Sequence, residues 1–146
     1  MSSKRKVGNV FDYVQKMKEE NPDCVIHIGC DSQNFGDKTT YVTAIVFRFP
    51  GHGAHVIYRK EKLPKIEVMW TKLWGELERS LNLATAITEN TGIEIKQIDL
   101  DFNSNPEFAS HKLLNAAQGY LSSLGFISRA KPNLLIAAWA ADVLCN

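Results

Sequence analysis

Residues 24–49 read CVIHIGCDSQNFGDKTTYVTAIVFRF and contain two runs rich in β-branched and aromatic side chains. Cys24–Cys30 is short and apolar, and Thr39–Phe49 has the strongest strand pattern in the sequence. The polar, glycine-bearing segment Asp31–Lys38 predicts a break between these two strands. A third strand is expected over His55–Arg59, after a Pro-Gly turn, and the short connections predict that the three strands run antiparallel.

Helical and strand patterns alternate in the rest of the sequence. A short amphipathic helix is expected over Asn9–Glu20, with Asn9 as its N-cap. From Lys65 to about Thr91, apolar residues recur at the spacing of helical turns, which predicts a long helix with one buried face. The later elements are expected to be a strand, a helix, a strand and a helix, over Glu94–Asp101, Glu107–Leu124, Phe126–Arg129 and Asn133–Cys145.

This order of elements predicts an α/β fold. Helical crossovers between strands of one sheet are nearly always right-handed and leave those strands parallel. We therefore expect a mixed five-stranded sheet, in which three antiparallel strands are followed by two parallel strands joined through helical crossovers, with flanking helices. No linker or repeat divides the chain, so a single domain is expected over residues 1–146, with residues 1–22 as an N-terminal helical extension.

Composition and charge exclude several classes of protein. The chain has 17 Lys and Arg against 16 Asp and Glu, so no general basic excess attracts a polyanion, and any nucleic-acid binding must come from a local arrangement. No window approaches the roughly 18 apolar residues of a membrane span, and no apolar signal region follows the start. We expect a cytoplasmic, soluble protein without a membrane partner, whose three cysteines are reduced thiols. The sequence predicts no oligomeric state.

Acidic residues are placed where such a sheet binds ligands. Asp31 is expected just past the first strand and Asp101 at the end of the fourth, and parallel neighbours would bring both to the same edge. Asp99 precedes Asp101 by two residues on the same face, and fits a ligand, a partner of a ligand or a solvated strand residue. Clustered carboxylates favour Mg²⁺ or Mn²⁺, and two such ions about 3.5–4 Å apart can activate water and stabilise the leaving oxygen of a phosphodiester.

The segment Ile28–Gln33, IGCDSQ, resembles the first-strand motif of ribonuclease H-like proteins, and in particular that of the YkuK-type group, also called DUF458. Further similarities lie on the long helix, after the fourth strand and around the last helix, at Glu78–Leu81, Asp99–Asn103, Lys131–Pro132 and Ala141–Asp142. The resemblance covers residues 24–145. It implies a nuclease that uses two Mg²⁺ or Mn²⁺ ions to hydrolyse phosphodiester bonds in RNA, an RNA/DNA hybrid or structured DNA.

The resemblance also implies roles for individual acids. Carried over by position, the catalytic metal ligands would be Asp31 on the first strand, Glu78 on the long helix, Asp101 on the fourth strand and Asp142 on the last helix. Glu76 is a close rival of Glu78, because it sits nearer the border of the buried helical face. Main-branch ribonuclease H enzymes carry a mobile histidine between the last strand and the last helix. Residues 128–133 contain none, so we expect product release or proton handling to differ.

Substrate contacts are expected from four further residues. Ser32 and Gln33 follow Asp31 directly, and Lys60 and Lys62 belong to a basic connection after the third strand. All four suit a sugar-phosphate backbone, although polar turns and solvated charge runs have the same composition.

Structural explanations compete with the functional ones. The acidic residues could also belong to a turn, a helix cap or a solvated helix face. The four histidines are scattered and are expected to have structural roles. The three tryptophans lie on helical patterns, which favours packing in the core. A non-catalytic nucleic-acid- or protein-binding module that retains the ribonuclease H-like fold is the alternative function. A nucleotide-binding relative is disfavoured because the sequence has no Gly-rich phosphate loop.

Overall fold

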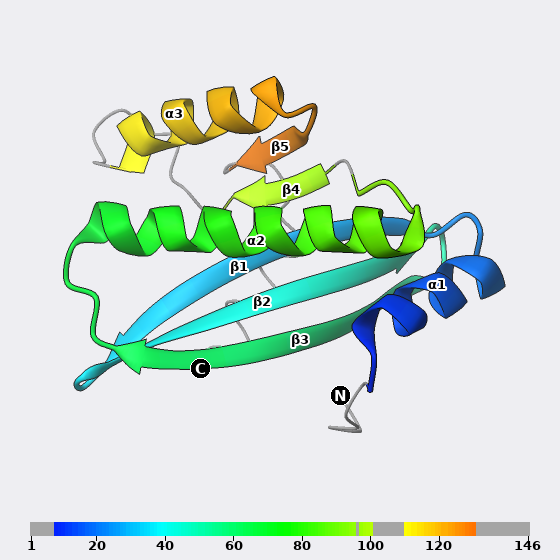
Figure 1. Ribbon diagram of the computed structural model, residues 1–146, viewed down its shortest axis with the longest axis horizontal. Coiled ribbons are helices and arrows are strands. Elements are labelled where there is room, and N and C mark those ends of the chain that lie inside the picture. The colour runs from blue at the N-terminus through cyan, green and yellow to red at the C-terminus, as the bar shows by residue number, and fades with distance from the viewer. Residues whose placement is uncertain (1–7, 96, 101–109, 131–146) are drawn as a thin grey trace.

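The computed structural model describes residues 8–95, 97–100 and 110–130. The elements in these ranges are α1 (Val10–Glu20), β1 (Val25–Phe35), β2 (Lys38–Phe49), β3 (Gly53–Pro64), α2 (Met69–Thr91), β4 (Gln97–Leu100), α3 (Ser110–Ser123) and β5 (Ile127–Ala130). The strands form one five-stranded sheet in the order β3-β2-β1-β4-β5 (Figure 1). Strand β2 pairs antiparallel with β1 and with β3, whereas β4 pairs parallel with β1 and β5 pairs parallel with β4, which confirms the predicted fold class.

The three helices pack on one face of this sheet (Figure 1). Val14 of α1, Leu77 of α2 and Leu121 of α3 are fully or almost fully buried there. They pack in the same cluster as Ile28 of β1 and Ile98 of β4. Side chains alternate along a strand, so the residues on either side of Ile28 face the opposite side of the sheet. None of the described helices is apolar over a length that could cross a membrane.

A second buried cluster lies on the face of the sheet opposite the helices. Val42 and Ala44 of β2 are its fully buried members, and Val56 and Tyr58 of β3 pack against them. On β1, Asp31 is the register partner of Val42, so the Asp31 side chain lies on this second face.

Strand β1 continues through the segment where we expected a break. It runs to Phe35, and β2 begins at Lys38, so a two-residue turn with Gly36 at a φ of 57° joins them. The Asn34 side chain accepts a hydrogen bond from Thr39 Oγ1 at 2.7 Å and donates one to the Ile66 carbonyl at 3.2 Å. These contacts stabilise polar residues within the strand. The predicted position of Asp31 beyond a strand end is therefore wrong.

The bounds of other strands and helices also differ from those predicted. Strand β3 extends to Pro64, so Lys60 and Lys62 lie in an edge strand instead of a connection. Helix α2 begins at Met69, not Lys65, because the Lys65 backbone N–H donates to the Asp37 carbonyl and so ties that segment to the β1–β2 turn. The expected last helix, 133–145, lies outside the described residues, as do residues 107–109 of the expected third helix.

The first helix matches its prediction. Asn9 caps α1, since its Oδ1 accepts hydrogen bonds from the backbone N–H of Phe11 at 2.9 Å and of Asp12 at 3.2 Å. Tyr13 fixes the helix to the sheet through a hydrogen bond between its hydroxyl and His55 Nε2 on β3. The histidine thus has a structural role there, as expected.

Candidate functional site

Asp31 lies within β1 and is only 6% exposed. Among the described residues, β4 pairs with β1 only at Ile28 and Gly29. From Cys30 onward, the edge of β1 that faces β4 has no strand partner in the described part of the chain. Asp31 lies two residues beyond Gly29, the last described partner of β4, toward the carboxyl ends of the two parallel strands, which is the edge where open α/β sheets bind their ligands.

The helix carboxylate nearest to β1 is Glu76, not Glu78. Glu76 is 4% exposed, and the Ser32 hydroxyl donates a hydrogen bond to its Oε2. Glu78 is exposed on α2. Glu76 and Ser32 lie on the helix-covered face, whereas Asp31 points to the opposite face. The two carboxylates thus lie on opposite sides of the same short segment of β1.

Asp99 is held by a polar network on the same face as Asp31. It is 1% exposed, which excludes the solvated alternative, and its register partner on β1 is Gly29. Gln97 Nε2 lies 3.3 Å from Asp99 Oδ1 and 2.9 Å from Nδ1 of the buried His27. Arg48 Nε donates to the other ring nitrogen of His27 at 3.3 Å. His27 consequently packs as a structural residue that holds Gln97 at the start of β4.

The described acids do not by themselves form a metal site. Asp101 and Asp142, the other two predicted ligands, lie outside the described residues. Within residues 8–95, 97–100 and 110–130, no three His, Cys, Asp or Glu side chains lie close enough together to hold an ion. Asp31 and Glu76 offer carboxylate oxygens, the donor chemistry that Mg²⁺ and Mn²⁺ prefer. The oxygen donors of Asp31 and Glu76 therefore match the ligand preference of Mg²⁺ and Mn²⁺. Two carboxylates do not complete a site, so a further acid would have to come from outside the described ranges.

The predicted substrate-binding residues divide between the two faces of the sheet. Ser32 is buried against Glu76 on the helix-covered face. Val42 of β2 is the register partner of both Asp31 on β1 and Lys60 on β3, so these three residues form one row across the sheet. Gln33 and Lys62 belong to the row two residues further along β1. Both lysines are exposed. Adjacent strands are about 4.8 Å apart, so the Lys60 backbone lies about 10 Å from that of Asp31 on the same face.

The two described cysteines suit structural roles. Cys24 and Cys30 are buried free thiols, and burial raises the pKa of Cys30 well above its ordinary value. Thr43 Oγ1 donates to Cys30 Sγ at 3.5 Å. A thiol held in this protonated state is a poor nucleophile and a poor metal ligand.

Sequence reasoning did not identify Arg79 as a site residue. Its guanidinium lies 3.7 Å above the centre of the Tyr41 ring and donates to the Gly75 carbonyl at 3.1 Å. It also donates to both carboxylate oxygens of Glu61, at 3.0 and 3.2 Å. Burial raises the pKa of Tyr41 to about 12. These partners lie on three different elements, so no local sequence pattern could have indicated the cluster.

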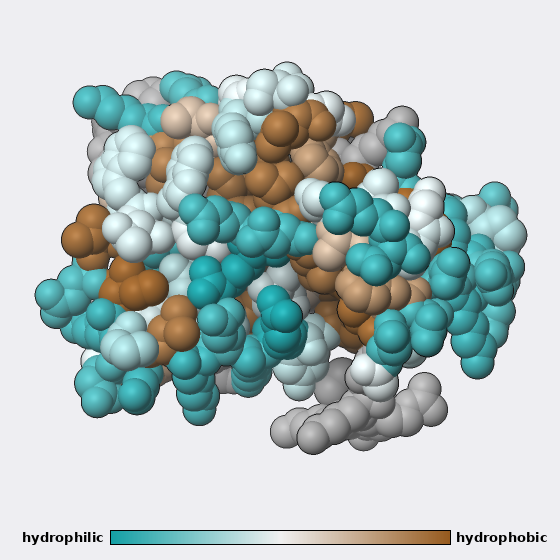
Figure 2. All heavy atoms as spheres, viewed as in Figure 1, coloured by the Kyte–Doolittle hydropathy of each residue, from teal (hydrophilic) through white to brown (hydrophobic). Residues whose placement is uncertain are grey.

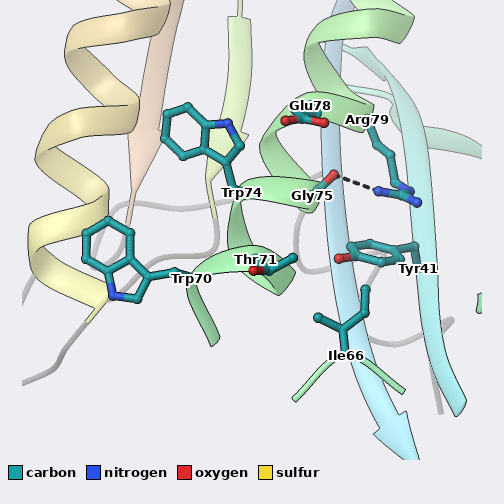
Figure 3. A pocket seen from close by; sticks show the side chains of 8 residues that line it. All are labelled: Tyr41, Ile66, Trp70, Thr71, Trp74, Gly75, Glu78 and Arg79. Carbon is teal, nitrogen blue, oxygen red and sulfur yellow. Dashed lines mark hydrogen bonds between the residues drawn. The ribbon is translucent and has the colours of Figure 1, made fainter. Parts of the chain in front are cut away.

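An open pocket of about 460 Å³ crosses α2 beside this cluster (Figure 3). Thr71, Gly75 and Glu78 lie along the helix, with Tyr41 and Arg79 on the side of β2. The aromatic residues Trp70 and Trp74 lie on the side of α3. Trp70 is 46% exposed, so the prediction that it packs in the core is wrong.

Replacement of Glu61 by glutamine should cost at most about 1 kcal/mol at neutral pH, because the Glu61 side chain is 40% exposed and solvent screens its ion pair. The hydrogen bonds from Arg79 lower the pKa of Glu61. The stabilisation is therefore present at neutral pH, declines below the ordinary glutamate pKa, and is lost once the folded carboxyl is protonated. Urea unfolding of both proteins between pH 7 and pH 3 tests this, and a difference independent of pH would contradict it.

Comparison with known proteins supports the same fold. A family model described as ribonuclease H-like matches residues 8–145, a range that includes every described helix and strand. No curated protein matches the chain.

Proposed function

Because the chain belongs to the ribonuclease H-like family, we propose that it is a divalent-metal-dependent nuclease that hydrolyses phosphodiester bonds in RNA or another nucleic acid. The observation that carries this proposal is the pair of buried carboxylates, Asp31 and Glu76, on the two sides of one segment of β1. Asp31 and Ser32, the hydrogen-bond partner of Glu76, are neighbours on β1, so both carboxylates lie at the same position along the strand, and carboxylate oxygens are the ligands that Mg²⁺ and Mn²⁺ prefer.

We assign the ligand roles to Asp31 and Glu76, together with the two acids outside the described residues, Asp101 and Asp142. Glu76 takes the place of Glu78 in this assignment, because only Glu76 lies against β1. Two bound Mg²⁺ or Mn²⁺ ions would supply an activated water and stabilise the leaving oxygen. The Ser32 hydroxyl orients the Glu76 carboxylate through its hydrogen bond, in the way that outer partners orient metal ligands.

We assign phosphate binding to Lys60 and Lys62, which stand exposed on the face that Asp31 shares. Gln33 lies in the same row as Lys62 and can donate a hydrogen bond to a sugar or phosphate oxygen. A net charge of +1 adds little general attraction. If these two ammonium groups make the main phosphate contacts, the logarithm of duplex affinity should fall against the logarithm of salt concentration with a slope of about −2.

The experiment that tests this function is a cleavage assay on RNA, DNA and RNA/DNA hybrid, with Mg²⁺, with Mn²⁺ and with EDTA. Cleavage in the presence of either ion and none in EDTA is the expected result. Titration with Mn²⁺ should also raise the melting temperature, since a ligand that binds only the folded chain stabilises it.

A different outcome would favour the non-catalytic alternative. Nucleic-acid or protein binding without metal-dependent cleavage, and without a rise in melting temperature on Mn²⁺ addition, would assign the chain to the class of binding modules that retain this fold.

A further inference from the structure

The pocket across α2 combines a flat aromatic surface with two polar groups of opposite charge. The indole of Trp70 is half exposed, and Trp74 beside it is braced by Tyr120 of α3 at a ring separation of 5.9 Å. Glu78 and Arg79 stand on the next helical turn and line the same pocket (Figure 3). A volume of about 460 Å³ is in the range of sites that hold small planar ligands.

The Arg79 guanidinium is fixed and still able to donate. It is held by Glu61, by the Gly75 carbonyl and by the face of Tyr41. A guanidinium has five N–H groups, and these contacts among the described residues use three of them. The guanidinium can therefore offer further N–H groups to an acceptor at this position without moving.

Charge argues against a phosphate in this pocket. Glu61 neutralises Arg79, and Glu78 adds a negative charge, so the local balance repels an anion. A single-stranded segment meets a different arrangement, because one base can stack on the Trp70 indole while the edge of a neighbouring base donates to a carboxylate and accepts from a guanidinium.

We propose that this pocket binds an unpaired segment of the nucleic-acid substrate, with one base stacked on Trp70 and the polar edge of a neighbouring base between Glu78 and Arg79, about 12 Å further along α2. The inference rests on the proposed function, since it requires nucleic acid to reach the chain. The pocket also adjoins the candidate carboxylates. Tyr41 is the register partner of Ser32, and Ser32 donates to Glu76, so the pocket lies about one strand spacing from that contact.

This position predicts the class of substrate. A base can enter the pocket only when it is unpaired and unstacked from its neighbours, and a blunt duplex offers none except at its ends. The substrate should therefore carry a single-stranded segment near the cleaved bond.

The test measures binding in EDTA, where no metal-dependent cleavage takes place. A labelled single-stranded RNA of 12 nucleotides is titrated with wild-type protein, Trp70→Ala and Met69→Ala. Base stacking on an aromatic side chain is worth about 1–3 kcal/mol, so Trp70→Ala should raise Kd about 5- to 150-fold. Met69 is 40% exposed beside Trp70 but does not line the pocket, so Met69→Ala is the matched control and should bind as the wild type does.

A second probe separates the base from the backbone. An abasic oligonucleotide of the same length keeps its phosphates, so wild type and Trp70→Ala should bind it with equal, weak affinity. Trp70→Phe retains a stacking surface and should recover most of the affinity for RNA, which also guards against a folding defect in Trp70→Ala. Equal affinity of wild type and Trp70→Ala for RNA would overturn the inference. It would also be overturned if Trp70→Ala weakened binding of the abasic oligonucleotide as much as it weakened binding of RNA.

The outcomes also distinguish this inference from the proposed function. Metal-dependent cleavage without any Trp70-dependent binding would leave the nuclease in place and remove the base pocket. Trp70-dependent binding without cleavage would keep the pocket and remove the nuclease.

Apolar side chains gather where α2 begins, at the left of Figure 2, and Val68 is 60% exposed there. Self-association of the chain that Trp70→Ala abolishes, without RNA binding, would assign this surface to a protein contact and overturn the inference.

Discussion

Asp31→Asn is expected to lower metal-dependent cleavage by more than about 100-fold without unfolding the protein. Partners that merely orient a metal ligand already contribute about 10- to 100-fold, so loss of a ligand's charge should cost more. Asparagine has nearly the same shape as aspartate and can fill the same buried position on β1. Cleavage rates at saturating substrate and Mn²⁺, with circular dichroism of both proteins, provide the measurement. Equal rates for wild type and Asp31→Asn would rule out a catalytic role for this residue.

The helix offers a matched pair of controls for the same experiment. Glu76→Gln keeps an oxygen that can accept the Ser32 hydrogen bond, and it should lower the rate about 10- to 100-fold or more. Glu78→Gln, two residues further along α2, should lower the rate at saturating substrate much less than Glu76→Gln does, since Glu78 is exposed. Saturating substrate is necessary because Glu78 lines the pocket to which we assign a base. The reverse ranking would restore Glu78 as the ligand.

The order of elements was predictable because it depends on local patterns. Alternation and β-branched residues indicated the strands, and helical periodicity indicated α2. The C-terminal end of β1 was not predictable, because the polar residues there are stabilised by partners elsewhere in the chain. Asn34 bonds to Thr39 across the hairpin and to the Ile66 carbonyl beyond β3. A local sequence pattern contains no information on such contacts, so polar residues in a strand are interpreted as a break.

The choice between Glu76 and Glu78 illustrates a second limit. Both lie near a border of the buried face of α2, one on each side. Periodicity gives the angle of a side chain around the helix but not which border faces β1. That depends on how the helix lies across the sheet, which is decided by packing of residues such as Leu77 and Ile87 on β1 and β4.

Gly75→Ala is expected to destabilise the protein by about 2 kcal/mol, against the usual effect of this substitution in a helix. Alanine normally stabilises a helix interior by about 0.5–1 kcal/mol relative to glycine. Here an added Cβ would overlap the Tyr41 hydroxyl oxygen and lie 3.0 Å from its Cζ and 3.1 Å from Arg79 Nη1. Tyr41 is 1% exposed, lies under the Arg79 guanidinium and donates to the Lys72 carbonyl at 2.9 Å. It therefore has no room to move aside, and overpacking of this kind costs about 1–3 kcal/mol.

Urea unfolding of four variants separates this clash from a general effect of alanine. Gly119 of α3 has no atom within 4 Å of its added Cβ, so Gly119→Ala should stabilise the protein by about 0.5–1 kcal/mol. Tyr41→Phe removes the oxygen that clashes, so Gly75→Ala should cost at least about 0.5 kcal/mol less in that background than in the wild type. A cost of Gly75→Ala that is equal in both backgrounds would mean that the helix backbone, and not Tyr41, requires the glycine. Stabilisation by Gly75→Ala in the wild type would show that α2 does not approach β2 as closely as the Tyr41–Lys72 hydrogen bond requires.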